Sequence, residues 1–434
     1  MATHDPSSPR LSRRELMAGA AGSLGAAMVG SRVAGAAVPS AEPAPPPAAS
    51  PWTDRQFEIY QAGQRGVKPA RPVSVEQLEK AAQQVMSAEA FGYVAGGAGS
   101  EDTMRANLEA FRRWRIVPRM LRDVSRRRMD TEVLGQRIPS PVLLAPLGVQ
   151  SIIHREGELP VARAARALGM PMVLSTVSSN TLEDVAAALG PTPRWFQLYW
   201  PKDPELTASF VHRAEKAGYA AIVVTLDTNL LGWRERDIQN AYLPFLAGEG
   251  IANYLSDPVF RAKLPPGADA DPAAVGQTFE RIVTNTALTW KDLAWLRRTT
   301  RLPIVVKGIL DPEDARRALA EGVAGIGVSN HGGRQVDGAV AALDALPRVV
   351  EAVRDRAAVI FDSGIRRGAD VVKALALGAR CVMLGRPYAY GLAVGGEEGV
   401  RDVLLNLLAD LDLTLALAGC ASVSELGPVN LLEA

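Results

Sequence analysis

The segment SNHGGRQVDG (329–338) brings a histidine and an arginine within three residues of each other, among glycines. A histidine can take up and release a proton near neutral pH, and an arginine can hold a carboxylate through two parallel hydrogen bonds. His331 is one of only four histidines in the chain. His331 and Arg334 together therefore predict general base catalysis on a substrate that carries a carboxylate.

Other interpretations of these two side chains remain open. His331 could be a structural residue, a hydrogen-bonding loop residue or a metal ligand, and Arg334 could form an ordinary surface ion pair. The remaining histidines are His4, His154 and His212, and none has the spacing to His331 that is typical of a metal site. We therefore predict no metal ion.

The chain that must position these residues contains eight short runs rich in Val, Ile and Leu. They lie at 141–146, 171–176, 194–200, 220–227, 302–308, 325–330, 358–364 and 381–387. Continuous apolar runs are typical of parallel strands that are buried on both faces, and helix-like segments such as 311–322 separate them. The pattern predicts an α/β fold of the (β/α)8 TIM-barrel class. No G-x-G-x-x-G motif opens the first unit, which argues against a dinucleotide-binding fold.

Polar residues stand at most of the predicted strand ends, and in a barrel these ends converge on one face. They are Gln197, Tyr199, Thr225, Asp227, Lys307, Ser329, Asn330, His331, Arg334, Asp362, Gly385 and Arg386. Any one of them could simply reach solvent, but their convergence indicates an active site. An acid such as Asp227 would orient the ring of His331 and stabilise its protonated form.

Two features of this face suggest a cofactor. Lys307 could form a Schiff base with a carbonyl substrate, or it could stay charged and stabilise negative charge on a cofactor ring. The loops DSGIRRG (362–368) and GRPYAYG (385–391) place glycines and arginines after strands seven and eight, where barrels commonly bind phosphate. Ordinary glycine-rich turns are the alternative.

Two stretches lie outside the simple barrel repeat. Residues 73–130 predict a helical segment before the first strand. Residues 228–290 form a connection after strand four that is too long for a simple loop, and we predict that it contains a lid over the active-site face. The barrel domain is assigned to residues 57–434.

The N-terminus differs from the rest of the chain. Arg13 and Arg14 precede a stretch of Ala and Gly, and the pattern predicts a twin-arginine export signal over residues 1–36, followed by a Pro/Ala-rich linker over 37–56. A membrane anchor is the alternative, but Arg32 interrupts the stretch and its residues are weakly apolar. We expect an exported protein without a stable anchor, or otherwise a cytoplasmic one.

The overall charge limits the kinds of molecule that the protein is expected to bind. Lys and Arg number 48 against 47 Asp and Glu, which leaves a formal net charge of +1. Such a balance gives no general attraction to nucleic acid. Two cysteines, Cys381 and Cys420, make neither a disulfide framework nor a metal cluster. The predicted partner is a small molecule.

In their order along the chain, FQLY, VKG, SNHGGRQ, DSGIRRGADVVKALALGA and GRP resemble the FMN-dependent family that oxidises L-2-hydroxy acids. This family includes glycolate and lactate oxidases, mandelate and lactate dehydrogenases, and lactate 2-monooxygenase. The resemblance runs from about Phe57 to near the C-terminus. It implies FMN as the cofactor, a small 2-hydroxy acid as the substrate, O2 or another electron acceptor and, by analogy, a homo-oligomer of four or more subunits.

The resemblance also implies a role for each matching residue. His331 would take a proton from the substrate, and Asp227 would pair with it. The groups implied to contact the substrate are Tyr93, Tyr199, Arg234 and Arg334, of which Tyr199 would lie near the substrate oxygen. The residues implied to contact FMN are Pro146, Leu147, Gly148, Ser175, Gln197, Thr225, Lys307, His331, Asp362, Ser363, Gly364, Arg366, Gly385 and Arg386.

Within the family, YVAGGAGSEDTMRAN, TLDTNLLGWRERD and PFLAGEGIANYLSDPVF are similar to the lactate 2-monooxygenase branch. That branch implies conversion of L-lactate and O2 to acetate, CO2 and water in a site that retains the keto acid. Val177 stands where many oxidases carry an aromatic residue, and Gly148 is found in both monooxygenase-like and dehydrogenase-like members. The alternatives are an oxidase or dehydrogenase that releases the 2-keto acid, a Schiff-base aldolase or lyase that uses Lys307, and a non-catalytic flavin- or phosphate-binding barrel.

Overall fold

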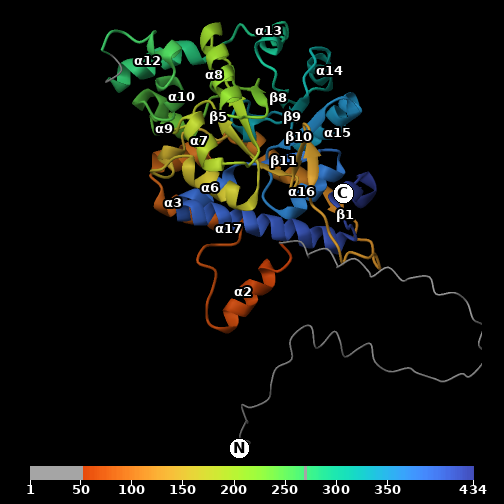
Figure 1. Cartoon of the computed structure of the whole chain (residues 1–434). Helices are drawn as coiled ribbons and strands as arrows, with labels where there is room; N and C mark the ends of the chain where they lie inside the picture. The colour runs from red at the N-terminus through yellow and green to blue at the C-terminus, as the bar shows by residue number, and fades with distance from the viewer. Residues whose placement is uncertain (1–51, 268–270) are drawn as a thin grey trace, which may run out of the picture. The chain divides into compact units, whose positions relative to one another are not determined.

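Eight parallel strands close into a barrel at the centre of the protein, as the sequence predicts (Figure 1). The computed structural model describes residues 52–267 and 271–434. The barrel strands are β4 (Val142–Leu144), β5 (Met172–Ser175), β6 (Arg194–Leu198), β7 (Ile222–Thr225), β8 (Ile304–Ile309), β9 (Gly325–Val328), β10 (Ala358–Asp362) and β11 (Cys381–Leu384). They pair in this order, and β11 pairs with β4 to close the barrel. The predicted export signal and the linker up to residue 51 lie outside the described residues.

A helix follows each barrel strand. These helices are α6 (Leu159–Leu168), α7 (Leu182–Leu189), α8 (Pro204–Lys216), α13 (Asp292–Thr299), α14 (Pro312–Ala320), α15 (Ala342–Val353), α16 (Gly368–Ala376) and α17 (Arg386–Ala418). Local sequence fixes several of their ends: Thr181 and Asp203 accept backbone N–H bonds at the starts of α7 and α8, and Gly169 ends α6 in the left-handed conformation. Because helices cover the barrel, β5, β7, β9 and β11 are buried along their whole length.

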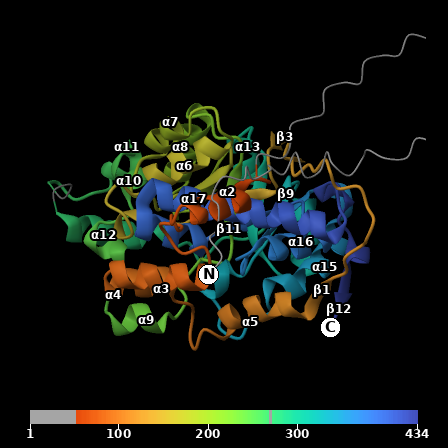
Figure 2. The same cartoon turned by 90° about the horizontal axis from the view of Figure 1, so that it is seen from below.

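The segment before the barrel is helical, as predicted, but only as far as residue 113. It contains α2 (Arg55–Gln64), α3 (Val75–Val85), α4 (Ala88–Ala95), α5 (Asp102–Ala110) and a 3-10 turn, η1 (Phe111–Arg113). Strand β1 (Trp114–Ile116) then pairs with β12 (Leu431–Glu433) near the C-terminus, and β2 (Thr131–Val133) pairs with β3 (Gln136–Ile138). Helix α17 packs on α3, α6 and α16, and Figure 2 shows it crossing the centre of the view. No helix in the described part of the chain is long and apolar enough to cross a membrane.

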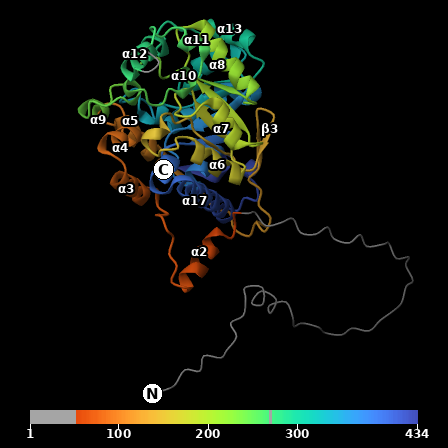
Figure 3. The same cartoon turned by 60° about the vertical axis from the view of Figure 1, so that its left-hand side comes forward.

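The connection after β7 contains short helices, which the sequence did not predict. They are α9 (Glu235–Gln239), η3 (Pro244–Ala247), α10 (Ala252–Leu255), α11 (Pro258–Arg261) and α12 (Pro272–Val283). Helices α11 and α12 each begin with an Asp-Pro pair whose carboxylate accepts a backbone N–H, a start that proline stabilises. In Figures 1 and 3 these helices gather near α8, on the side of the barrel away from α2.

Candidate active site

A cavity of about 460 Å³ opens at the C-terminal ends of the barrel strands, where the sequence places the site. The predicted residues that line it are Tyr93, Pro146, Leu147, Gly148, Tyr199, Arg234, Lys307, His331, Arg334, Asp362, Ser363, Gly364, Arg366, Gly385 and Arg386. The remaining predicted residues, Asp227, Ser175, Gln197 and Thr225, lie beneath the cavity surface and are nearly buried. The fold therefore brings the predicted set together in one region.

His331 and Asp227 form a hydrogen-bonded pair. The Nδ1 atom of His331 is 2.8 Å from Oδ1 of Asp227 and 3.0 Å from the hydroxyl of Thr228, which in turn donates to the same Asp227 oxygen. Since a carboxylate can only accept, Nδ1 carries the hydrogen and Nε2 is left with its lone pair. Nε2 lies 3.5 Å from the hydroxyl of Tyr199, beside the cavity. The arrangement is that of a general base whose ring is oriented by an acid.

The charges in this pair support that role. Burial raises the pKa of Asp227, but the neighbouring His331 and Lys307 outweigh burial, so the net pKa lies below its usual 3.8 and the acid stays ionised. Burial lowers the pKa of His331 below its usual 6.5, although the charge of Asp227 opposes this change. At neutral pH the imidazole is therefore neutral and able to accept a proton.

The lowered pKa of His331 predicts how the activity depends on pH. Protonating His331 removes the base, so kcat/KM should be constant at neutral pH and should fall about tenfold per unit once the pH drops below the pKa of His331. We expect the midpoint of this loss below pH 6.5, the usual value for histidine. Steady-state rates over the acid and neutral range, with bound FMN checked by its absorbance at each pH, measure the profile. An acid-side midpoint above 6.5 would contradict the assignment.

Two arginines and a tyrosine form the positively charged side of the cavity. The guanidinium of Arg334 lies 5.0 Å from the ring centre of Tyr93, and that of Arg234 lies 6.0 Å from the same ring. Nη1 of Arg334 donates to the carbonyl oxygens of Tyr93 and Gly96, at 2.5 and 2.8 Å. Burial, together with the charge of Arg234, lowers the pKa of Arg334 to about 9. A bound carboxylate would offset this concentration of positive charge, which suits the predicted substrate.

Lys307 stands at the base of the cavity in a short polar chain. Its Nζ donates to the Ser329 hydroxyl at 2.9 Å and lies 3.1 Å from Oδ2 of Asp362, and the Ser329 hydroxyl donates to the same oxygen at 2.6 Å. Burial lowers the pKa of Lys307, but the charges of Asp362 and Asp227 outweigh it and raise the pKa above 10.5. The amine is therefore held as a cation, the opposite of what a Schiff-base nucleophile requires.

Three predicted flavin contacts form a second polar chain across neighbouring strands. The Ser175 hydroxyl donates to Oε1 of Gln197 at 3.0 Å, and Nε2 of Gln197 donates to the Thr225 hydroxyl at 2.9 Å. The strands set this alignment, because Ser175 pairs in register with Gln197 across β5 and β6. The chain fixes the amide orientation of Gln197 just beneath the cavity. A direct contact between these side chains and FMN stays a prediction.

Gly385 gives a direct test of whether the cavity fits FMN. A Cβ placed on Gly385 would meet only Ala145 Cβ at 3.9 Å and Leu147 Cδ2 at 4.0 Å, so it would project into open cavity space. A glycine at this position leaves that space free for a bound group such as FMN. Beside it, Arg366 and Arg386 follow β10 and β11, the strands after which barrels bind phosphate. The residues present fit FMN.

Part of the hydrogen-bonding capacity of Arg386 is used within the protein. Its Nε, Nη1 and Nη2 atoms donate to the carbonyl oxygens of Val94, Gly332 and Gly96 at 3.2, 2.9 and 2.7 Å. A guanidinium has five N–H groups, so two remain for a phosphate. These bonds also connect the loop that carries His331 to the end of α4.

The other side of the cavity is apolar and comes largely from the connection after β7. Its lining residues there include Leu230, Leu231, Leu243, Phe245, Leu246, Phe279 and Val283. This placement agrees with a segment that covers the active-site face. Whether it opens and closes as a lid stays a prediction.

Three further residues complete the site: Ser329 was predicted only as a strand-end residue, and Thr228 and Gln335 had no predicted role. Thr228 bonds the His331–Asp227 pair, and Ser329 joins Lys307 to Asp362. The amide of Gln335 donates to the carbonyl oxygens of Asp227 and Leu230 and accepts from Nη2 of Arg234. Ser329 and Gln335 belong to the motif SNHGGRQ, so their place in that motif was the available signal. No group of His, Cys, Asp and Glu side chains suited to a metal ion is present among residues 52–267 and 271–434.

Comparisons with known proteins agree with this geometry. Residues 82–433 match the family described as FMN-dependent dehydrogenase. An L-lactate oxidase of Lysinibacillus sphaericus is 46% identical over 362 residues, which cover 83% of this chain and 93% of the relative. Human 2-hydroxyacid oxidase 1 is 42% identical over 355 residues, covering 81% and 94%. A crystal structure of mandelate oxidase with (S)-4-hydroxymandelic acid superposes with a TM-score of 0.74 at 42% identity, covering 83% of this chain and 98% of that one.

Proposed function

This chain belongs to the family of FMN-dependent dehydrogenases, and we propose that it oxidises L-lactate with O2 and decarboxylates the keto acid before release. The coarser activity, FMN-dependent oxidation of a small 2-hydroxy acid, follows from the family and its relatives. The observation that carries the proposal is that the His331–Asp227 pair and Arg334 face one cavity. A base and a carboxylate-binding group that face the same cavity suit a carboxylic acid whose neighbouring carbon bears a hydroxyl group.

Each residue then has a task that its position permits. Arg334, Arg234 and Tyr93 hold the substrate carboxylate, and Nε2 of His331 receives a proton from the substrate. Asp227 stabilises the imidazolium that forms. Bound FMN supplies the acceptor for the two electrons that the substrate loses. Lys307, held as a cation, places positive charge at the base of the cavity, and Arg366 and Arg386 would hold the phosphate.

One observation supports decarboxylation within the site: the connection after β7 supplies the apolar side of the cavity, and such a cover can retain a product. The overall reaction balances, because one lactic acid and one O2 give one acetic acid, one CO2 and one water.

The second candidate is an oxidase that releases pyruvate and hydrogen peroxide. The names of the relatives favour it, because two of the similar proteins are L-lactate oxidases, from Lysinibacillus sphaericus and a Nostoc species. The same residues would perform the same first step. The two candidates differ only in how long the keto acid is retained.

Product analysis separates these candidates. The FMN-loaded enzyme is incubated with L-lactate under air, and acetate, pyruvate and hydrogen peroxide are measured. The proposal predicts one acetate per O2 consumed and little free peroxide. Catalase is left out of the main assay and added in a parallel one, because peroxide released to solution also decarboxylates pyruvate slowly. Formation of one pyruvate and one hydrogen peroxide per O2 consumed would contradict the proposal and show that the enzyme is an oxidase.

We also propose export through the twin-arginine pathway. Arg13, Arg14 and the Ala/Gly-rich stretch that follows support it. Replacing both arginines with lysine should leave the FMN-loaded enzyme in the cytoplasm, whereas the unchanged chain should reach the exported fraction. Cell fractionation followed by a lactate-dependent activity assay measures the distribution. Equal distribution of the two chains would exclude this pathway.

The analogy with the family further leads us to propose a homo-oligomer of four or more subunits. An exposed apolar side chain outside the cavity lining supports it: Trp233 follows β7 and is 69% exposed. Contacts between subunits commonly cover such groups.

A further inference from the structure

We propose that Asn253 is a positioning residue for FMN, acting through residues 175–178. Asn253 lies in α10, within the connection after β7, and its side chain is completely buried. It touches neither the cavity nor the His331–Asp227 pair. The inference depends on the binding of FMN and holds whichever hydroxy acid is the substrate.

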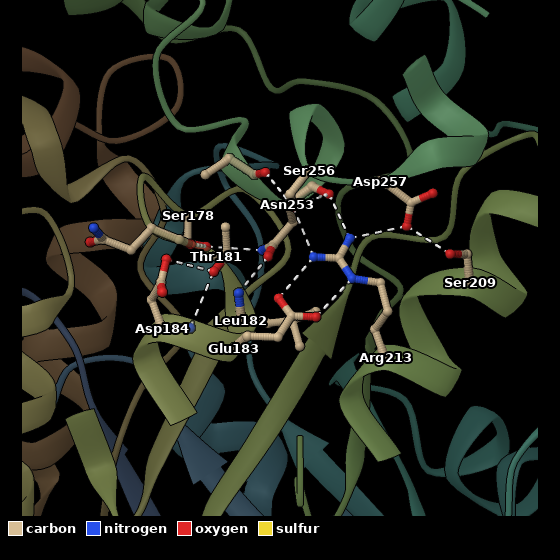
Figure 4. A network of polar contacts seen from close by, with 12 residues as sticks. Ser178, Thr181, Leu182, Glu183, Asp184, Ser209, Arg213, Asn253, Ser256 and Asp257 are labelled. Carbon is tan, nitrogen blue, oxygen red and sulfur yellow. Dashed lines mark hydrogen bonds and ion pairs between the residues drawn. The ribbon is translucent and has the colours of Figure 1, made fainter. Parts of the chain in front are cut away.

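The Asn253 amide joins the loop after β5 to the start of α7, through bonds that include Ser178 and Leu182 (Figure 4). Its Nδ2 donates to the carbonyl oxygen of Thr176 at 3.0 Å and to the Ser178 hydroxyl at 2.9 Å, with the Ser175 carbonyl oxygen at 3.5 Å. Its Oδ1 accepts the backbone N–H of Leu182 at 2.7 Å, the first residue of α7. A buried amide with both ends satisfied fixes the loop in one arrangement.

The fastened loop forms a wall of the cavity. Val177 lies in the middle of it and lines the cavity beside Gly148. The carbonyl oxygen of Val177 accepts the backbone N–H of Val149 at 2.8 Å, which joins this loop to the one after β4. A Cβ on Gly148 would lie 2.6 Å from both Cγ2 and the carbonyl oxygen of Val177, so the two residues pack closely and the shape of the cavity beside them depends on where Val177 lies. Because Asn253 bonds the residues on both sides of Val177, it determines that position.

A second set of contacts holds Asn253 itself in place. Nη1 of Arg213 donates to the Asn253 carbonyl oxygen at 2.9 Å and to Oδ2 of Asp257 at 3.0 Å (Figure 4). Nε and Nη2 of Arg213 donate to the Glu183 carboxylate, each at 2.9 Å. Asp257 is completely buried and also accepts from the Ser209 hydroxyl. Arg213 thus connects α10 to α7 and α8. Residues 251–257 are therefore held rigidly behind the loop after β5, which forms a wall of the cavity.

Asp257 is a matched control for Asn253. Both side chains are completely buried, both residues are bonded by Arg213, and they lie four positions apart. The Asp257 carboxylate bonds Arg213, Ser209 and the backbone of Val259, and no hydrogen bond joins it to residues 175–182 in the described part of the chain. Loss of either side chain should destabilise the fold. An asparagine at position 257 keeps an oxygen that can accept from Arg213, so Arg213 can still bond the Asn253 carbonyl oxygen, and only the Asn253 variants should change FMN binding.

The test compares Asn253→Asp, Asn253→Ala and Asp257→Asn as FMN-loaded proteins. Asn253→Asp replaces two N–H donors with a carboxylate that faces carbonyl oxygens, and Asn253→Ala removes the donors outright. We expect FMN to leave both Asn253 variants roughly five- to tenfold faster than the unchanged enzyme, measured by the rise of FMN fluorescence on dilution. The visible circular dichroism of bound FMN should change as well. Asp257→Asn should lower the Tm while both FMN measurements stay at their original values.

Two results would overturn the proposal. One is an unchanged FMN release rate and dichroism in folded Asn253 variants. The other is an equal change in Asp257→Asn, which would show that any loss of stability has this effect. If both Asn253 variants fail to fold, Ser178→Ala decides the question, because it removes one acceptor of the Asn253 amide. The proposal then requires Ser178→Ala to shift the FMN dichroism, and an unchanged spectrum rejects it.

Discussion

Replacing His331 with glutamine is expected to lower kcat/KM for L-lactate by roughly 10²- to 10⁴-fold while FMN stays bound. Glutamine places an uncharged amide near the position of Nε2 and fills much of the same space, although the bond from Nδ1 to Asp227 is lost. It offers no nitrogen lone pair in place of Nε2, and the proton from the substrate then has no acceptor. Steady-state kinetics, together with the visible spectrum of the purified variant, measure both parts of the prediction.

His212 provides the control for this substitution. It is an exposed histidine on α8 whose Nε2 lies 3.2 Å from the Thr299 carbonyl oxygen, and it is not part of the cavity lining. His212→Gln should leave kcat/KM and FMN content unchanged. If the FMN-loaded His331→Gln enzyme turns over as fast as the unchanged one, His331 is not the base. Loss of FMN from His331→Gln would instead show that the main role of His331 is to hold the cofactor.

Replacing Gly385 with valine is expected to weaken FMN binding by at least about 100-fold without unfolding the protein. The nearest atoms to an added Cβ are 3.9 and 4.0 Å away, so the protein has room for the side chain. That room is the cavity in which FMN must lie, so the valine and the cofactor compete for it. Fluorescence titration of FMN measures the affinity, and thermal unfolding in the absence of FMN measures stability.

Gly427→Val is the control for Gly385→Val. A Cβ at Gly427 meets no atom within 4 Å in the described part of the chain, and its backbone is extended. This variant should keep the affinity for FMN. Normal FMN binding by Gly385→Val would show that the cofactor lies elsewhere in the cavity. A large fall in the Tm of the Gly385→Val apoprotein would show that the position is structural.

Sequence reasoning recovered the barrel because its signal is local. Each strand is a continuous apolar run, and most runs are followed by a polar residue that the topology carries to one face. This alone brought Asp227, Lys307 and His331 into one region, although they lie in different parts of the chain. Their assignment to proton transfer and charge stabilisation depended further on the resemblance to a family.

The features that sequence reasoning missed depend on contacts between distant segments. Strand β1 forms only because β12, more than three hundred residues away in the chain, supplies its partner. The short helices after β7 are stabilised by packing: Tyr254 contacts Phe210, Phe260 and Phe279 with ring centres 4.9 to 5.3 Å apart. Asn253 shows no pattern in the sequence that separates it from a surface asparagine. Its role follows only from where α10 lies against the loop after β5.

The two sides of the cavity have different origins in the chain, and this has a consequence for evolution and engineering. His331, Asp227 and Arg334 follow barrel strands, whereas Arg234 lies in the connection after β7 and is cross-linked to them through Gln335. The apolar side comes largely from one insertion, the connection after β7, through residues such as Leu243, Phe245 and Phe279. Selectivity for the substrate side chain can therefore be altered by changing the apolar residues of this insertion, while Arg234 and the residues that follow barrel strands are kept. A small library confined to that insertion is the economical route to enzymes for new hydroxy acids.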